Sequence, residues 1–480
     1  MSGVVAGAPG ITGTLSDVRP DAAAVVEAAR RYTVFEWGTQ QVAPLAIERG
    51  SGIYLYGLDG VRYTDFNSIA MCVNIGHGDP RVAEAVAAQM AEVSFVSPFM
   101  VTRIRAEVGE LLAQRTPPGM TKAFFTLAGA DANEAAIRTA RLVTGRRKIL
   151  TRYRSYHGGS HGVLAASGDP RREPVEAGMG DIVRIPDPYH YRFPWIEDPA
   201  AFAAFNLAQI EQIIQLEGAH TIAAVMVEPV TGSNGLIVPP TGWLRGLRAL
   251  CDRYGILLIC DEVMSGFGRT GRWFASDHED VVPDLMTIAK GITSGYVPLG
   301  ACVLADHIAD AIEDRPFGSG LTYQSHAVGL AAAKAVLGIY ESDGLIDNAA
   351  AMGAHLLAGL RRLQEGHPSV GDVRGIGLFS CLELVYDRGS RLELFPLVGQ
   401  AGPAAAEIKA FLTGRGLLAN LRGSFLFANP PLVIDAAQID ESLAILDEAL
   451  DIADAATAER GAPPPAHAAN LIPFTPWSNR

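Results

Sequence analysis

The stretch GILLICDEV, residues 255–263, ends an apolar, strand-like run on two carboxylates. Strand side chains alternate between two faces, so the spacing predicts that Ile259, Asp261 and Val263 share one face. Glu262 would then lie on the other face. A carboxylate in so apolar a strand is costly unless a cation or a hydrogen-bond donor meets it. Asp261 therefore predicts a buried cationic partner, either a ligand or one of the arginines of the chain.

The runs on either side repeat this pattern. Strand-like stretches alternate with helical ones in KAFFTLAG, KILTRY, TIAAVMVEP, LMTIAKG and LGACVLAD. Such alternation is typical of an α/β domain with a largely parallel sheet. The stretch IERGSGIYLYGLDGVRYTDF upstream has short strands and turn residues instead, which predicts a β-meander.

Changes in pattern divide the chain into five parts. Residues 1–30 are rich in Gly and Ala and predict an arm, and residues 31–80 predict the N-terminal part of a small domain. Residues 81–330 predict a large cofactor-binding domain, and residues 331–457 predict the C-terminal small domain. Residues 458–480 form a Pro-rich tail.

Composition favours a globular protein and excludes several classes. The 480 residues are 49% hydrophobic with a formal net charge of −13, which disfavours nucleic acid as a partner. The sequence has no run of 18 apolar residues, so it predicts no membrane span. It also has no basic N-terminal region, so we expect no secretory signal. Five widely spaced cysteines in apolar surroundings indicate reduced core residues, so we expect a cytoplasmic protein.

Two short motifs resemble sites that their context argues against. GFGRTG, residues 266–271, matches a dinucleotide fingerprint, but the following RWFASDHEDVVPDLM is too polar and Pro-broken for the required helix. HGGSHG spaces His157 and His161 like a metal pair on a helix, yet two glycines intervene and no third ligand is near. We therefore predict neither NAD nor a metal.

Lys290 in MTIAKG, residues 286–291, is unusual for this chain. Only five of its 39 basic residues are lysine, yet Lys290 follows apolar Ile288 and Ala289. Either the stem covers apolar surface while the amine reaches water, or the position needs an amine that can lose its charge. Arginine cannot meet the second need, because a guanidinium stays protonated.

Two further stretches suit a phosphorylated, planar ligand. In FFTLAGADANEAAIRTARLV, a strand passes through Gly129 and Ala130 into a helix, whose free N–H groups would suit a phosphate; Asp131 could equally be an N-cap. Tyr156 in TRYRSYHGGS could stack on a planar ligand or pack in the core. Pyridoxal phosphate requires this combination of a phosphate cradle, apolar ring faces, an acidic partner for the ring nitrogen and a lysine amine.

At this point a family resemblance is visible. VMVEPVTGSNG, GILLICDEVMSGFGRTG, PDLMTIAKG and GSGLTYQSHAVGLAAAKAVL resemble the class III aminotransferases, a branch of the fold-type I pyridoxal-phosphate enzymes, over about residues 35–450. The resemblance implies an α/β fold: a large domain with a mostly parallel, seven-stranded sheet between helices, and a smaller α+β domain. FEWGTQ and GADANEAAIRTAR look most like the branch acting on taurine and ω-amino acids.

The resemblance also implies roles around the cofactor ring. Lys290 would be the Schiff-base lysine, and Asp261 the partner of the pyridinium nitrogen. Val263 would pack on one face of the ring and Tyr156 on the other, with His157 beside Tyr156.

Other implied contacts lie farther from the ring. Gly129 and Ala130 would supply phosphate-binding amides, and Thr322 would reach the phosphate across a homodimer interface. Glu228 would belong to the hydrogen-bond network around Asp261. Arg422 lies two residues from the position where related enzymes place a carboxylate-binding arginine, and on a strand it would keep the same face.

The predicted function is a ping-pong transfer of an amino group from an amine or ω-amino acid to a keto acid or aldehyde. A decarboxylase or aminomutase on the same scaffold is the alternative, because the reaction depends on which substrate bond stands perpendicular to the ring. A non-enzymatic cofactor-binding protein is a third option, which intact Lys290, Asp261 and Thr322 disfavour.

Overall fold

The computed structural model describes residues 21–37, 40–41, 44–97, 99–173, 180–398 and 401–459. Most of the predicted arm and tail therefore lies outside the described residues. Within the arm, Ala22–Tyr32 form helix α1, which Asp21 caps by accepting a hydrogen bond from the Ala23 amide. No helix in the described ranges is both long and apolar enough to cross a membrane.

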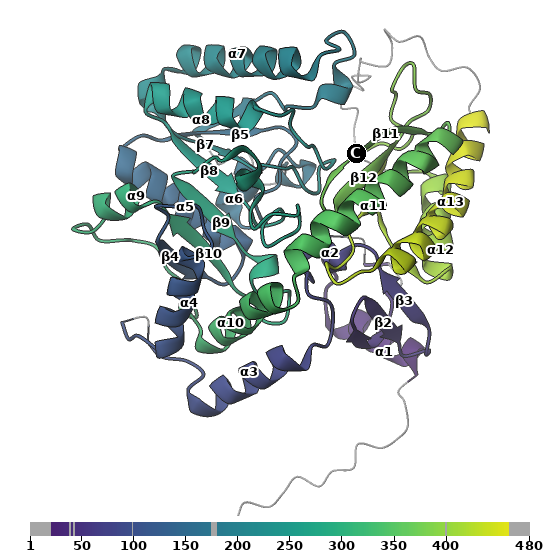
Figure 1. Ribbon diagram of the computed structural model, residues 1–480, viewed down its shortest axis with the longest axis horizontal. Coiled ribbons are helices and arrows are strands. Elements are labelled where there is room, and N and C mark those ends of the chain that lie inside the picture. Colours follow the sequence, from purple (N-terminus) through teal and green to yellow (C-terminus); the bar gives the residue numbers. More distant parts are fainter. Residues whose placement is uncertain are drawn as a thin grey trace, which may run out of the picture.

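A seven-stranded sheet forms the centre of the molecule (Figure 1). Its order is β4-β10-β9-β8-β7-β5-β6; the strands are β4 (Lys122–Thr126), β5 (Lys148–Arg152), β6 (Ile182–Ile185), β7 (Ile222–Val227), β8 (Leu257–Asp261), β9 (Leu285–Ile288) and β10 (Gly300–Leu304). The strands from β9 to β6 are parallel to their neighbours, and β10 runs antiparallel to both β9 and β4. The mostly parallel, seven-stranded sheet is confirmed.

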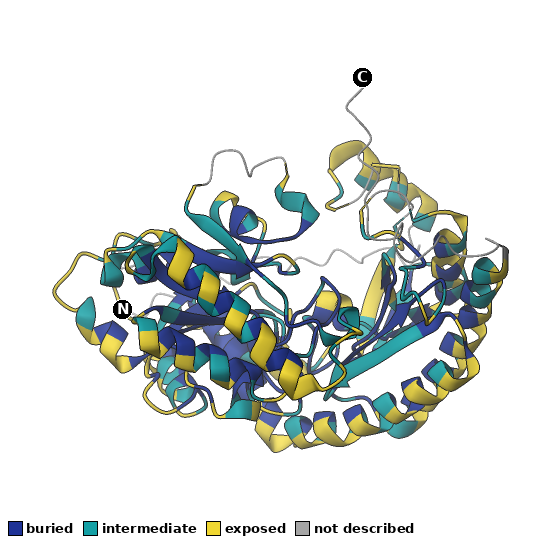
Figure 2. Cartoon of the chain, turned by 90° about the horizontal axis from the view of Figure 1, so that it is seen from above, coloured by how far each residue is buried: buried dark blue, intermediate teal, exposed yellow. Residues whose placement is uncertain are grey.

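Helices cover both faces of this sheet, and the strand residues alternate between two cores. Ile259 of β8 packs in one core with α5 (Gly129–Thr144), whereas Leu258 and Cys260 pack in the other. The second core is closed by α7 (Pro199–Glu217) and α8 (Trp243–Tyr254). Figure 2 shows the strands buried inside helices whose outer faces are exposed. The alternation predicted from GILLICDEV is therefore present.

Further helices surround the sheet and lead out of it. They are α3 (Pro80–Glu92), α4 (Arg103–Ala113), α6 (His161–Ala166), α9 (Asp306–Ala311) and α10 (Ala327–Ser342). α10 packs on α3 and α4, and α11 (Leu345–Gly366) follows it toward the smaller sheets (Figure 1).

Two four-stranded sheets lie beside the large one. The predicted meander is β1 (Ile47–Ser51), β2 (Tyr54–Gly57) and β3 (Arg62–Asp65), and β13 (Leu417–Leu418) joins β3 in parallel. The other sheet has the order β11-β12-β15-β14; its strands are β11 (Val370–Ile376), β12 (Phe379–Leu384), β14 (Asn420–Arg422) and β15 (Phe425–Ala428). Helices α2 (Ser68–Met71), α12 (Pro403–Gly414) and α13 (Ala436–Glu459) complete this part. The β3–β13 pair thus joins an N-terminal strand to a C-terminal one in a single sheet. The domain boundaries stay predictions.

The glycine-rich stretch GFGRTG forms turns between β8 and β9. Gly268 and Gly271 have positive φ angles of 83° and 81°, and the next helical segment is a short 3-10 turn at Ala275–Glu279. The described chain thus lacks, after this motif, the α-helix that a dinucleotide fingerprint requires. All five cysteines are described, and none forms a disulfide.

A histidine clamp fixes the end of α11 to α13. His367 Nδ1 lies 2.7 Å from Asp454 Oδ2, and Nε2 lies 2.9 Å from Asp447 Oδ1. Asp451 is part of the same group, whose ligand atoms lie within 4.8 Å of one another. Burial alone would lower the pKa of His367, but the hydrogen bonds and charges of the two aspartates outweigh it and raise the pKa.

This clamp predicts a pH dependence of stability. Because the folded-state pKa exceeds the unfolded value of about 6.5, the stabilisation is complete below about pH 6.5 and is lost as pH rises through the folded-state pKa. We expect His367→Gln to lower the free energy of unfolding by about 1 kcal/mol near pH 6 and by less near pH 9. Urea unfolding at both pH values measures this difference.

The control is His355→Gln. This variant removes a histidine contact with Asp440 that is more exposed to solvent than the contacts of His367. An equal loss at both pH values in His367→Gln would contradict the charge-based account.

Candidate active site

A cavity of about 190 Å³ lies where β7 and β8 end, next to the start of α5. The open α/β sheet thus holds its cavity outside the carboxyl ends of strands, where such folds bind ligands. Its walls come from five separate parts of the chain: Gly129, Ala130, Asn133, Tyr156, His157, Gly158, Gly159, Glu228, Asp261, Val263, Met264 and Lys290.

Asp261 is the buried anion of this cavity, with only 3% of its surface exposed. Its Oδ2 lies 2.7 Å from His157 Nδ1 and accepts a hydrogen bond from Asn133 Nδ2 at 2.8 Å. Its Oδ1 accepts a hydrogen bond from the backbone of Val263 at 3.0 Å. His157 is the titratable partner on the protein side, and its own Nε2 is buried without a partner among the described residues.

Glu228 lines the same cavity, and its place in the network around Asp261 stays a prediction. Its Oε1 accepts a hydrogen bond from the Tyr156 amide at 3.0 Å, and its Oε2 accepts one from the Gly232 amide at 2.7 Å. No direct hydrogen bond to Asp261 exists within the described chain. Desolvation raises the pKa of Glu228, and the nearby charge of Asp261 adds to this increase.

The first turn of α5 forms a tight cradle. Asp131 caps the turn from inside the helix, because its carboxylate accepts hydrogen bonds from the amides of Leu127 and Ala128 at 2.6 and 2.8 Å. Gly129 and Ala130 face the cavity. The first amides of a helix have no acceptor within it, so this end can bind an anion.

Two glycines bring the walls of this cradle together. A Cβ atom on Gly129 would lie 2.8 Å from Val263 Cγ1, and one on Gly158 would lie 2.6 Å from Ala130 Cβ. Gly158 also has a φ of 135°, which a side chain would strain. The loop after β5 therefore approaches α5 as closely as backbone allows.

Lys290 extends into the cavity from a 3-10 turn at Lys290–Ile292 that follows β9. Its φ of 43° lies in the left-handed region, which is uncommon for a residue with a side chain and marks local strain. Its amine has no hydrogen bond or ion pair among the described residues. Desolvation lowers the pKa of Lys290, although the nearby Asp261 and Glu228 oppose that shift.

Two residues of the predicted set lie outside this cavity. Thr322 is exposed in a turn before α10, and Arg422 is in β14, where its Nη2 lies 2.5 Å from Asp169 Oδ2. Their predicted contacts with phosphate and carboxylate stay predictions. His161, the second histidine of HGGSHG, is exposed at the start of α6, away from the buried His157.

Sequence reasoning missed Asn133, which connects three parts of the site. Its Nδ2 donates to Asp261 and to the His157 carbonyl, and its Oδ1 accepts a hydrogen bond from Thr287 Oγ1 at 2.6 Å. The sequence signal that could have identified Asn133 is a side-chain amide on the buried, alanine-rich face of α5, one turn after Gly129. Gly158, Gly159 and Met264 were also missed.

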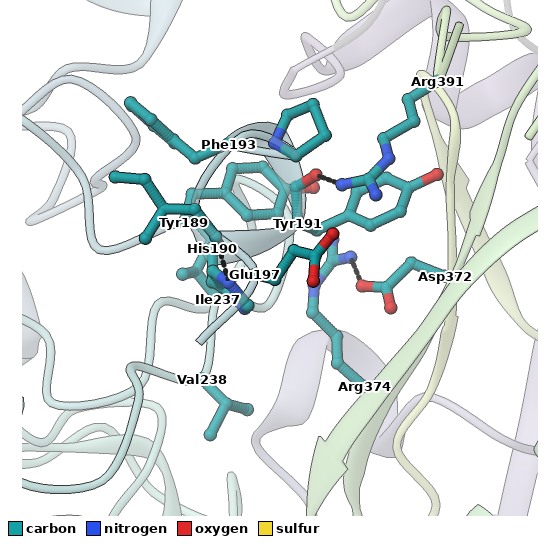
Figure 3. A pocket seen from close by; sticks show the side chains of 12 residues that line it. Tyr189, His190, Tyr191, Phe193, Glu197, Ile237, Val238, Asp372, Arg374 and Arg391 are labelled. Carbon is teal, nitrogen blue, oxygen red and sulfur yellow. Dashed lines mark hydrogen bonds and ion pairs between the residues drawn. The ribbon is translucent and has the colours of Figure 1, made fainter. Parts of the chain in front are cut away.

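A second cavity, of about 390 Å³, lies between the loop after β6 and strand β11 (Figure 3). Arg374 donates to Asp372 at 2.6 Å and to the carbonyl of Leu236 at 3.0 Å, and Arg391 donates to the backbone of Tyr191. Arg374 and Asp372 already form an ion pair there, and none of the described lining residues is a lysine. This second cavity therefore offers no lysine amine among its described lining residues.

The Lys290 cavity fits pyridoxal phosphate. Gly129 and Ala130 form a cradle that an added Cβ would obstruct, and Asp261 is a buried carboxylate that can pair with a ring nitrogen. Lys290 offers an amine whose charge burial disfavours. Fold and cavity together define a fold-type I pyridoxal-phosphate enzyme.

Comparison with known proteins supports this class of enzyme and narrows it to one family. Residues 36–450 match the family model of aminotransferase class-III. The chain belongs to the class III aminotransferases, which use pyridoxal phosphate.

Several characterised relatives cover most of the chain. The diaminobutyrate–2-oxoglutarate transaminase of Halomonas elongata is 35% identical over 86% of this chain and 92% of its own length. The taurine–pyruvate aminotransferase of Rhodobacter capsulatus is 34% identical over 90% of this chain and 98% of its own.

The solved structures that resemble this chain are transaminases as well. The taurine:2-oxoglutarate aminotransferase of Bifidobacterium kashiwanohense, in complex with pyridoxal phosphate and glutamate, has a TM-score of 0.88 and 38% identity. The match covers 90% of this chain and 98% of that one. An (S)-enantioselective ω-transaminase of Thermomicrobium roseum has a TM-score of 0.84 and 37% identity, over 90% and 99% of the two chains. These relatives are transaminases and give no support to the decarboxylase alternative.

The cradle makes a prediction about Gly158. We expect Gly158→Ala to raise the dissociation constant of pyridoxal phosphate by about tenfold or more, because the new Cβ strains the loop and displaces Ala130. Fluorescence titration of the apoenzyme with the cofactor measures this change.

The matched control is Gly159→Ala, whose Cβ would find only the Tyr156 hydroxyl at 3.6 Å. Similar losses in both variants would show that the close approach of Gly158 to Ala130 is unimportant.

Proposed function

We propose that this enzyme transfers the amino group of an ω-amino acid to a keto acid by a ping-pong mechanism. The observation that carries this proposal is one cavity that combines buried Asp261 with the amine of Lys290, which has no partner among the described residues. The names of the relatives support the donor class, because taurine and diaminobutyrate both carry an acid group as well as the transferred amine.

Bound pyridoxal phosphate supplies an aldehyde that takes up the amino group and a ring that accepts electrons from the substrate carbon. The amine of Lys290 then moves a proton from the substrate carbon, acting first as a base and then as an acid. A low pKa favours this role, since the amine must be neutral to accept a proton.

The other predicted contacts hold the ring in place. Asp261 would pair with the protonated ring nitrogen, and His157 and Asn133 keep the Asp261 carboxylate oriented. Val263 and Tyr156 would contact the two ring faces, and the amides of Gly129 and Ala130 would bind the phosphate. We retain Arg422 as a ligand of the substrate's acid group.

Removing the amine tests this mechanism. We expect Lys290→Ala to lower the rate of amino transfer by about 10²- to 10⁴-fold, because the proton-transferring group is lost. In the unaltered enzyme, an amine donor should bleach the visible band of the bound cofactor, and a keto acid should restore it. Stopped-flow absorbance with a panel of amines measures both half-reactions.

The control is Lys409→Ala. Lys409 is an exposed lysine on α12, so this variant should react like the unaltered enzyme. Failure of every primary amine to bleach the band would contradict the proposed function.

The proposal includes a cytoplasmic homodimer, in which Thr322 reaches the phosphate of the partner subunit. An apolar surface on two neighbouring segments supports this arrangement: Phe99 and Val101 are exposed on one, and Leu321 and Tyr323 on the other. The rings of Phe95 and Tyr323 lie 5.4 Å apart and join the segments. Exposed apolar surface of this kind marks protein contacts.

Disrupting this surface should separate the subunits. We expect the unaltered enzyme to have twice the chain mass of 50.9 kDa, and Phe99→Asp to shift the mass toward that of one chain and weaken cofactor binding. Light scattering with size-exclusion chromatography measures the mass.

Trp195→Asp is the control, because Trp195 is an exposed aromatic residue outside these segments. A single-chain mass for the unaltered enzyme with full cofactor binding would refute the shared site.

A further inference from the structure

Arg152 is a fully buried arginine at the carboxyl end of β5. Its Nη2 donates a hydrogen bond to the main-chain carbonyl of Glu228 at 2.5 Å. Its Nε and Nη1 are also buried and have no acceptor in the described chain, and no described carboxylate is close enough to form an ion pair with it. Burying a guanidinium without an ion pair is costly, so the presence of Arg152 points to a function.

The Arg152 side chain approaches the active site from behind the large sheet. Strand alternation places it with Leu150 in the core under α7 and α8, where its guanidinium carbon lies 5.8 Å from the centroid of the Trp243 ring. By the same alternation, Asp261 lies on the other face of the sheet, with Ile259. Arg152 is therefore close to the site without lining its cavity.

Four titratable groups surround the guanidinium: Asp187 after β6, Glu228 after β7, and Cys260 and Asp261 of β8. Burial lowers the pKa of Arg152, and these four groups oppose that shift. A guanidinium nevertheless stays protonated at neutral pH. Burial also raises the pKa of the Cys260 thiol, which is therefore neutral. Arg152 is thus a permanent positive charge that faces three buried carboxyl groups.

Glu228 connects Arg152 to the Lys290 cavity. Its carbonyl accepts the hydrogen bond of Arg152, and its carboxylate accepts those of the Tyr156 and Gly232 amides. Tyr156 lines the cavity and follows Arg152 by four residues on the same segment. Arg152 therefore binds the residue that holds the Tyr156 amide, and its own strand leads directly to Tyr156.

The charge of Glu228 depends on its neighbours. Desolvation raises the pKa of Glu228 and the charge of Asp261 adds to the increase, whereas His157 and Arg152 oppose it. Of these two, Arg152 carries the charge that does not titrate near neutral pH. An ionised carboxylate is the stronger acceptor for an amide, so loss of that charge would weaken the hold on Tyr156 at acidic pH.

We propose that Arg152 is a positioning residue of the active site, which holds the end of β7 and keeps Glu228 in the charged form that fixes Tyr156 against the cofactor ring. The inference rests on the proposed function, because the contact between Tyr156 and the ring is part of it. Arg152 acts through Glu228 and touches neither cofactor nor substrate.

Two substitutions separate the charge of Arg152 from its hydrogen bond. Arg152→Gln keeps a donor for the Glu228 carbonyl and removes the charge, whereas Arg152→Lys keeps the charge and loses the planar fork of donors. The apoenzyme of each variant is titrated with pyridoxal phosphate from pH 5 to pH 9, and fluorescence gives the dissociation constant. The bleaching of the cofactor band by 3-aminopropanoate is then measured over the same pH range.

We expect Arg152→Gln to move the acidic midpoint, the pH at which cofactor affinity falls on acidification, upward by about one unit. This shift is a tenfold change in the ionisation equilibrium of Glu228. Arg152→Lys should keep the midpoint of the unaltered enzyme, because the positive charge remains. Adding Glu228→Gln to Arg152→Gln should abolish the shifted midpoint, since glutamine does not titrate.

Arg146→Gln is the matched control. Arg146 Nη1 also donates to main-chain carbonyls, those of Ile222 and Gly255 at 3.1 and 2.8 Å, but at the opposite end of the same strands. Both glutamine variants should lower the melting temperature, and only Arg152→Gln should move the acidic midpoint.

An unchanged midpoint in Arg152→Gln would overturn the inference and leave Arg152 a structural residue. A shifted midpoint in Arg152→Lys would overturn it as well, because the charge is retained there. If Arg152→Gln does not fold, the charge serves the fold, and the positioning role fails too. If the midpoint shifts as expected but no amine bleaches the unaltered enzyme, the proposed function fails and the role of Arg152 in the cofactor site holds.

Discussion

The burial of the Asp261 carboxylate constrains the whole cavity. An ionised carboxylate at the end of an apolar strand is stable only with donors around it, and here they come from the loop after β5 and from α5. His157 and Asn133 therefore have to meet at Oδ2, which brings the ends of separate strands together. The same contact sets how far the first turn of α5 lies from Lys290, because α5 carries both that turn and Asn133.

A second buried ion, Arg269, joins the smaller sheets to the large one near Lys290. The Arg269 guanidinium is fully buried and donates to Ser68 Oγ and Asn74 Oδ1, at 2.8 and 2.7 Å, and to the carbonyls of Leu378 and Pro430. All four acceptors are neutral, and desolvation lowers the pKa of Arg269 to about 10. The turn after β8 thus holds segments from both halves of the chain, around Ser68 and around Pro430, against the cavity, and it places a cation near Lys290. That cation helps to lower the pKa of the Lys290 amine.

The sequence predicts the parts of the site that depend on local pattern. Strand alternation places Asp261 and Val263 on one face, and the glycine turn before α5 predicts the cradle. Contacts between distant residues have no such pattern. Arg422 and Asp169 are 253 positions apart, so their ion pair depends on how two sheets meet. Glu228 was expected in the hydrogen-bond network around Asp261. The backbone amides of Tyr156 and Gly232 that hold its carboxylate could not be predicted, because backbone geometry leaves no trace in residue identities.

The strained backbone of Lys290 follows from the packing around it. A left-handed φ at a residue with a side chain costs roughly 1–3 kcal/mol and persists only where neighbours impose it. Gly291 has no room for a Cβ, which would lie 2.7 Å from Asn74 Nδ2 and 2.8 Å from Phe267 Cβ, and Tyr340 donates to its carbonyl at 2.8 Å. The turn is therefore fixed by its backbone and not by its amine. The Lys290 amine contributes nothing to holding the turn. It can therefore change its bonding and its protonation during a reaction without loosening the site.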